Sequence, residues 1–378
     1  MKHLALFTLL CLGMTEDAAP PFVAHEWGTF TSVSGSDGVM IDWRPLLGAD
    51  DLPKFVYRDG EGRGYLQGIG TKNLFPTRVR METPVIYFYS DREREVSVKV
   101  AFPKGRITEW YPAAVTVKPE LNWGMLKIVP KADVALPREA AESHYYPARN
   151  TDAALVRVWN RSAAAVEEYQ YEKFLFYRGV GTFDLPLRAT LDQRTVTIDR
   201  IGPDALSTAI LFENSGGRVG FRRTGPIATR VRVERPELTA EVDHVMAELE
   251  LLLAESGLYA KEARAMVETW RSSWFEEGLR VFYLVPRRAT NEVLPLTIDP
   301  KPDQLVRVLV GRAEIITPEQ ELLMTALARK LVSVPEPART AAQAELKKLG
   351  RFAEPTLRRV LATTRDAALQ ARIQELLK

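Results

Sequence analysis

Cysteine is almost absent from this chain of 378 residues, which contains only Cys11. No intramolecular disulfide can form, and zinc or iron–sulfur sites built from several thiolates are excluded. If the segment that carries Cys11 is removed, thiol catalysis is excluded as well. The folded chain must therefore be stabilised by packing, for which a hydrophobic content of 46% is ample at this length.

Sequence signatures of common enzyme sites are also lacking. The chain has only four histidines, and it contains no phosphate-binding loop, no GxSxG elbow and no nucleotide fingerprint. The glycines at 60, 62, 64, 68 and 70 fit no GxGxxG register, so Asp59–Gly70 is typical of a surface loop. No sequence motif indicates a particular reaction.

Long hydrophobic runs are missing too, since the apolar run Leu4–Leu12 is too short to cross a bilayer. Its length and the preceding Lys2 predict a secretory signal peptide, residues 1–13, with cleavage after Gly13 or as late as Ala19. A buried N-terminal helix and a lipid anchor on Cys11 are the alternatives, although Leu10 is large for a lipoprotein signal. The expected location is periplasmic or secreted.

Charge of either sign is not in excess, because the net charge is +2 and becomes +1 when Lys2 is removed. Nucleic acid is therefore not expected as a partner.

Residues 22–317 show short alternating or β-branched runs between turn residues, a pattern that predicts an antiparallel β-sandwich-like body. The clearest expected hairpin joins 208–213 to 218–223 through Asn214–Gly217. Helical spacing of apolar residues predicts an inserted helical pair within 239–271. Strands follow within 279–315, and whether they complete the first sheet is left open.

The segment 318–378 is predicted to be all α, with a linker at Pro335 and Pro337. Residues 336–378 carry nine basic and five acidic side chains. The run Leu349–Leu361 resembles the helical hairpin of a HEAT-type repeat. One such repeat cannot bury its own apolar face, so we expect the tail to dock on the body or on a partner.

Three segments of the body resemble a set of uncharacterised bacterial exported proteins with an N-terminal HEWGTFT motif. They are His25–Ser32 (HEWGTFTS), Arg80–Tyr89 (RMETPVIYFY) and Glu172–Gly179 (EKFLFYRG). The resemblance covers residues 22–318. It implies an exported β-rich body as one unit, and it implies no activity.

A metal site would have to use His25 and His144, because neighbouring His25 and Glu26 point to opposite faces of a strand. Three protein ligands are needed for a zinc of the catalytic type, and His244 lies opposite the apolar stripe of its helix. We therefore expect no metal and no other cofactor.

Carboxylates beside aromatic residues suggest a second chemistry, glycoside hydrolysis, with Glu26 or Glu277 as acid or base. The same surroundings could bind a ligand without cleaving it, through His25, Trp27, Trp110, Tyr111 or Trp274. The sequence favours a binding or interaction module for a glycan, peptide or protein partner. A hydrolase that uses Glu26 or Glu277 with His25 and His144 is the alternative, and convergence of these residues in one cleft would favour it.

Overall fold

The computed structural model describes residues 21–42, 52–59, 77–160, 168–333, 335–349 and 352–377. The predicted signal peptide, its later cleavage position and the glycines at 60–70 lie outside the described residues.

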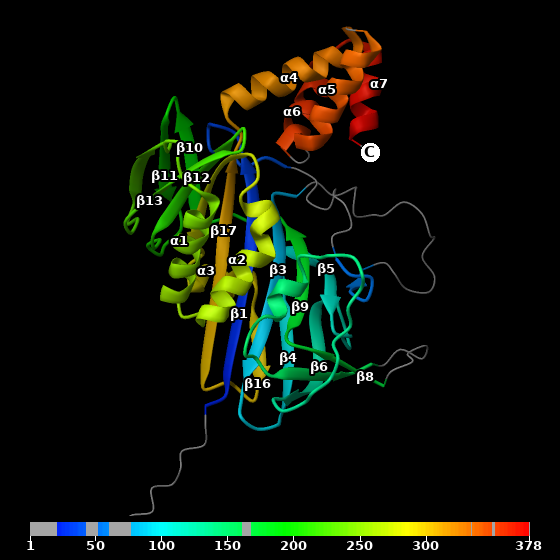
Figure 1. Ribbon diagram of the computed structural model, residues 1–378, viewed down its shortest axis with the longest axis vertical. Helices are drawn as coiled ribbons and strands as arrows, with labels where there is room; N and C mark the ends of the chain where they lie inside the picture. The colour runs from blue at the N-terminus through cyan, green and yellow to red at the C-terminus, as the bar shows by residue number, and fades with distance from the viewer. Residues whose placement is uncertain are drawn as a thin grey trace, which may run out of the picture.

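The body is built around a nine-stranded sheet (Figure 1). β1 and β17 lie at its centre and pair in parallel, from Val23 with Gln304 to Ser34 with Ile315, whereas the other neighbouring strands are antiparallel. The strand order is β13 (Arg218–Arg223), β12 (Ala209–Ser215), β15 (Gly278–Leu284), β17 (Gln304–Ile315), β1 (Val23–Ser34), β3 (Val79–Tyr89), β9 (Leu175–Gly181), β5 (Gly105–Tyr111) and β2 (Tyr57–Arg58).

Two smaller antiparallel sheets pack against one face of the large sheet. The five-stranded sheet has the order β16 (Leu296–Asp299), β4 (Arg94–Ala101), β6 (Glu120–Val129), β7 (Leu155–Trp159) and β8 (Tyr169–Glu172). The three-stranded sheet has the order β10 (Leu187–Asp192), β11 (Thr195–Arg200) and β14 (Arg230–Glu234). One hydrophobic core joins all three sheets, and it includes Phe30, Trp123 and Ile198. The predicted β-sandwich-like body is confirmed.

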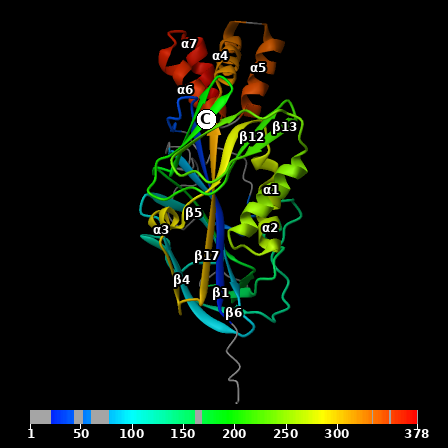
Figure 2. The same cartoon turned by 90° about the vertical axis from the view of Figure 1, so that its left-hand side faces the viewer.

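Helices cover the opposite face of the large sheet (Figure 2). α1 (Val242–Glu255) and α2 (Ala260–Trp274) form the predicted pair, which ends three residues later than expected. They share a second core with η2 (Tyr146–Arg149) and with sheet residues such as Trp27 and Phe282. The short α3 (Arg287–Val293) precedes β16 and was not predicted, since it lies within the segment 279–315 that was expected to form strands.

The strands after α2 do complete the earlier sheets. β15 and β17 join the nine-stranded sheet, whereas β16 pairs with β4 in the five-stranded sheet. The predicted hairpin is present as β12 and β13, and only its two glycines, Gly216 (φ +63°) and Gly217 (φ +79°), adopt the left-handed conformation.

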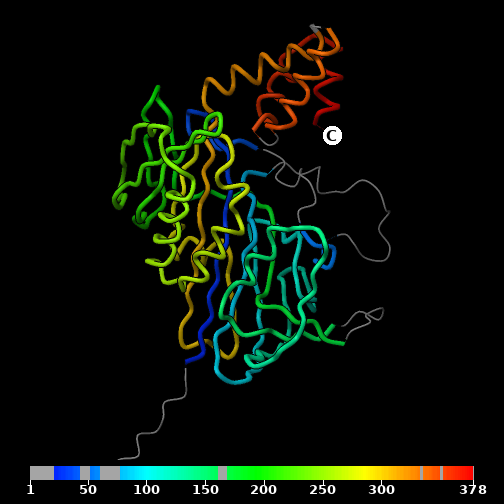
Figure 3. Tube along the Cα trace, viewed as in Figure 1, coloured from blue at the N-terminus to red at the C-terminus, as the bar shows by residue number. Residues whose placement is uncertain are grey.

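Four helices form the C-terminal tail at one end of the body (Figure 3): α4 (Pro318–Ser333), α5 (Glu336–Leu349), α6 (Ala353–Thr363) and α7 (Ala367–Leu376). Their core contains Leu331, Leu346, Leu357 and Ile373, and from the body chiefly Val33 and Ile316. The tail contacts the body as expected, because Val33 and Ile316 belong to its core, and α4 covers much of the apolar face of the later helices. Within the described residues, no helix combines the length and the apolarity needed to span a membrane.

Candidate functional site

His25 lies on β1 and points toward the helices. Its Nδ1 is 2.6 Å from Glu262 Oε2 on α2, and both side chains are fully buried. The Tyr259 ring covers the imidazole, with 4.6 Å between ring centroids. His25 therefore ties the central strand to the start of α2 and is not accessible to a ligand from outside.

Glu26 points to the opposite face of β1, into the core between the sheets. Arg307 Nε lies 2.6 Å from Glu26 Oε2, and Tyr177 donates to Glu26 Oε1 at 2.6 Å. Burial raises the pKa of Tyr177, and the neighbouring Glu26 charge raises it further, so the phenol keeps the proton it donates. Burial alone would lower the pKa of Arg307, but the charges and hydrogen bonds of Glu26 and Tyr177 together outweigh burial and raise it. Glu26 thus belongs to a closed ion pair.

The remaining hydrolase candidates lie elsewhere. His144 lies 3.1 Å from Arg178 Nη2, stacks on Trp270, and lines a pocket of about 560 Å³ together with Glu142 and Glu268. Glu277 is exposed and accepts hydrogen bonds from the Gly216 N–H in the β12–β13 turn. His25, Glu26, His144 and Glu277 are not gathered in one cleft.

The aromatic candidates divide into two groups. Trp27 and Trp274 are fully buried in the core beneath the helices, so neither ring is available to a ligand. Tyr111 lies at the end of β5 and lines a pocket, and the neighbouring Trp110 stacks on Tyr57 with centroids 6.1 Å apart.

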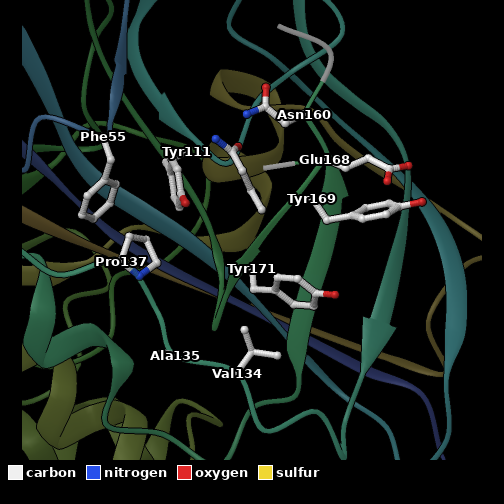
Figure 4. A pocket seen from close by; sticks show the side chains of 10 residues that line it. Phe55, Tyr111, Val134, Ala135, Pro137, Asn160, Glu168, Tyr169 and Tyr171 are labelled. Atoms are coloured by element: carbon white, nitrogen blue, oxygen red, sulfur yellow. The ribbon is translucent and has the colours of Figure 1, made fainter. Parts of the chain in front are cut away.

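This pocket is a candidate binding site and has a volume of about 640 Å³ (Figure 4). It lies where the β8 edge of the five-stranded sheet faces the β5–β2 edge of the large sheet. The lining residues are Phe55, Tyr111, Val134, Ala135, Pro137, Asn160, Glu168, Tyr169, Gln170 and Tyr171. Phe55 and Tyr111 line the pocket on one side, and Tyr169 and Tyr171 line it along β8 with their rings pointing away from the other two (Figure 4). The space is large enough for one or two side chains of a ligand.

Gln170 fixes the two sheet edges at the pocket. Its Oε1 accepts from the Ala113 N–H at 2.8 Å, and its Nε2 donates to Tyr57 Oη at 2.8 Å. Burial raises the pKa of Tyr57, while the Gln170 hydrogen bond opposes this shift, so the phenol is neutral at physiological pH. The inner wall of the pocket is uncharged and held in place.

Charges lie at the rim of the pocket. The guanidinium of Arg157 stacks over the Tyr169 ring at 4.7 Å, and Arg149 lies 5.8 Å from the centre of the Phe55 ring. Arg149 also binds Glu172, with 2.6 Å between Nη2 and Oε2. These contacts orient the aromatic walls.

Sequence reasoning identified Tyr111 but missed Phe55, Tyr169 and Tyr171. Aromatic and polar residues alternate in Tyr169–Glu172, which is a strand signal, but a run of four residues is too short to be distinctive. The sequence also does not show that this strand, β8, lies at the edge of a sheet. Within the described ranges, no group of three or more His, Cys, Asp or Glu side chains is placed to hold a metal ion. The absence of a resident metal stays a prediction.

No protein-family model matches the chain, and no curated protein matches it by sequence. Among solved structures it is similar to the yeast delta-COP-I mu-homology domain, with 8% identity and a TM-score of 0.30, over 79% of this chain and 98% of that chain. The same domain complexed with a Dsl1 WxWxV peptide gives 7% identity and a TM-score of 0.25, over 79% and 97% of the two chains. At these values the likeness is too distant to carry an argument about function.

Proposed function

We propose that this chain is an exported binding module that takes an extended peptide segment of a partner protein at the pocket beside β8. The observation that carries the proposal is the aromatic pocket of about 640 Å³ between two sheet edges. Aromatic rings fixed in position give large contact area with little loss of conformational entropy, which is why they dominate many peptide-binding sites.

The position of β8 supports a peptide over a compact ligand. Among the described strands, β8 pairs only with β7 and ends its sheet. A strand at a sheet edge presents backbone groups that a second extended chain can pair with, while pockets beside it accept alternate side chains. Tyr169 and Tyr171 both line the pocket, so a strand added at β8 would place a side chain against them.

The hydrolase alternative receives no support from the arrangement of its residues. Glu26 is closed off by Arg307 and Tyr177, and His25 is paired with Glu262. Export is part of the proposal on the strength of the N-terminal sequence and the resemblance of the body to exported proteins.

Panning the full mature chain against a phage-displayed library of linear peptides tests the proposal. We expect enrichment of peptides with a large apolar or aromatic anchor, and Tyr171→Ser should weaken their binding at least tenfold by loss of stacking area. Tyr259→Ser is the matched control, because Tyr259 is 44% exposed and lies at the start of α2. Equal binding by wild type and Tyr171→Ser would refute the pocket as the peptide site.

A further inference from the structure

The three sequence segments that resemble exported proteins meet in space at a place distinct from the peptide pocket. His25–Ser32 lies in β1, Arg80–Tyr89 in β3, and most of Glu172–Gly179 in β9, and these strands are neighbours in the large sheet. Next to β1 on its other side lies β17, with Arg312 and Glu314. The pocket uses no side chain from β1, β3 or β17.

The backbone is irregular at this meeting point. The pairing of β1 with β3 shifts register between Trp27 and Thr29, opposite Thr83 and Pro84. Gly28 is required there, because a Cβ would lie 2.8 Å from Pro84 Cα. Thr83 has φ +47°, which is strained for a β-branched residue. Bulges and strained residues of this kind concentrate at functional sites, where they aim particular side chains.

The side chains aimed by this irregularity form what we call the polar row. Arg312 on β17 is directly opposite Thr31, and Thr31 is directly opposite Arg80 on β3. Thr29, two residues before Thr31, is opposite Glu82. Directly opposed residues share a sheet face, so the row places two short threonines between long side chains from strands that are about 10 Å apart.

Several buried groups in the polar row have no hydrogen-bond partner in the described part of the chain. They are the hydroxyls of Thr29, Thr31 and Thr83, Oε2 of Glu82 and Nη1 of Arg312. The residues that carry them are at most 2% exposed. Buried polar groups are nearly always satisfied, so a cluster of this kind indicates a bound species.

The partners that the row does have show which atoms are left over. Arg312 Nη2 binds Glu276 at 2.6 Å, and Glu82 Oε1 lies 3.3 Å from Arg80 Nε. Arg312 Nε also pairs with Glu314, which receives Arg280 Nε at 3.0 Å. The charged groups are therefore ion-paired, but Nη1 of Arg312 and Oε2 of Glu82 have no hydrogen-bond partner and come from the strands on either side of the β1 threonines.

We infer that the polar row is a binding site for a small zwitterion that carries a carboxylate and an ammonium group, such as a free amino acid. The carboxylate accepts from Arg312 Nη1 and the threonine hydroxyls, while the ammonium donates to Glu82 Oε2. Each contact is a charge-assisted hydrogen bond, and the ligand adds no net charge to a buried region. A simple anion would meet Glu82, and a simple cation would meet Arg312.

The row reaches solvent at two positions. The side chain of Glu276 is 34% exposed on the Arg312 side, and that of Arg80 is 16% exposed on the β3 side.

Thermal unfolding of the full mature chain with added probes tests this site. Glycine, β-alanine and γ-aminobutyrate vary the distance between ammonium and carboxylate, while acetate and methylammonium carry one charge each. We expect at least one zwitterion to raise the melting temperature at millimolar concentration and neither single-charge probe to do so. Isothermal titration calorimetry with the active probe then gives its affinity.

Three variants connect the binding to the row. Thr31→Val should abolish the shift without lowering the melting temperature of the ligand-free protein, because the lost hydroxyl has no partner there. Glu82→Gln should weaken binding at least tenfold by removing the acceptor charge. Thr269→Val is the matched control, since this buried hydroxyl bonds Ala265 O at 2.7 Å, and it should keep the shift. A shift of equal size with acetate, no shift with any zwitterion, or a shift that survives Thr31→Val would each overturn the inference.

Discussion

Glu26 is a catalytic candidate by sequence, but in the structure its side chain has a structural role. Its neighbours His25 and Trp27 suggested an acid or base, yet its carboxylate is 0% exposed and is bound by Arg307 and Tyr177. Arg307 in turn donates to Asn291 Oδ1 and Leu294 O, so the group ties β1 and β17 to the C-terminal end of α3. Alternation along β1 gave the opposite faces of His25 and Glu26, but it carries no information on partners that are hundreds of residues away.

At this scale we predict that Glu26→Ala lowers the free energy of unfolding by about 3–5 kcal/mol, because it leaves the Arg307 charge buried and unpaired. Urea denaturation measures the loss. In the matched control, Glu292→Ala removes the partner of Arg288 in a pair whose side chains are both 65% exposed, and it should change the free energy of unfolding by less than about 0.5 kcal/mol. Losses of similar size at the two positions would contradict the buried ion pair as a stabilising element.

Helices and strands were predicted better than their arrangement. The apolar stripe of α1, including Val245, Leu249 and Leu253, is buried as its spacing indicated, and the hairpin β12–β13 lies where it was predicted. The strand order was not predictable, because periodicity reports which face of a strand is buried and says nothing about its neighbour. The pocket beside β8 was missed for the same reason, since it exists only where two sheet edges face each other.

For the helical cover we predict that Leu249→Ala destabilises the protein by about 2–5 kcal/mol, because the side chain is fully buried and its removal leaves a cavity. Leu251→Ala, two residues along the same helix, replaces a side chain that is 48% exposed and should cost less than about 1 kcal/mol. Thermal and urea unfolding compare the two. If both variants matched wild type, α1 would contribute little to the core.

The whole molecule consists of a three-sheet body with its helical cover and a four-helix tail that has its own core. The prolines at 335 and 337 suggested a domain boundary near Ser333. In the structure this position lies between α4 and α5, inside the four-helix tail. Met324, Leu327 and Leu331 of α4 pack against the later helices, so a division at Ser333 would expose them.

We therefore predict different outcomes for two truncations. A chain ending at Thr317 should keep the melting temperature of the body within a few degrees, because the tail core takes few residues from the body. A chain ending at Ser333 should aggregate, because the apolar face of α4 is left uncovered. Calorimetry and light scattering distinguish the two, and a loss of ten degrees in the shorter chain would show that the tail is an integral layer of the body.

The N-terminal prediction also belongs to the whole molecule. Expressed with its full sequence in a bacterium, the exported protein should begin between Met14 and Pro20, because the apolar run is short and small residues follow it. N-terminal sequencing of the extracytoplasmic fraction gives the position. Recovery of chains that still start at Met1, or that carry an acylated Cys11, would contradict the expected cleavage.

The parallel pairing of β1 with β17 has a consequence for the order of events on the ribosome and after it. The two central strands are separated by more than 250 residues, so β1 has no native neighbour on that side until almost the whole body has been synthesised. Contacts of such high sequence separation fold slowly, because loop closure must precede the gain from pairing. The nascent body therefore stays without its central strand pair for most of synthesis, a condition compatible with the export that we propose, because translocation channels of the secretory type admit only unfolded chains.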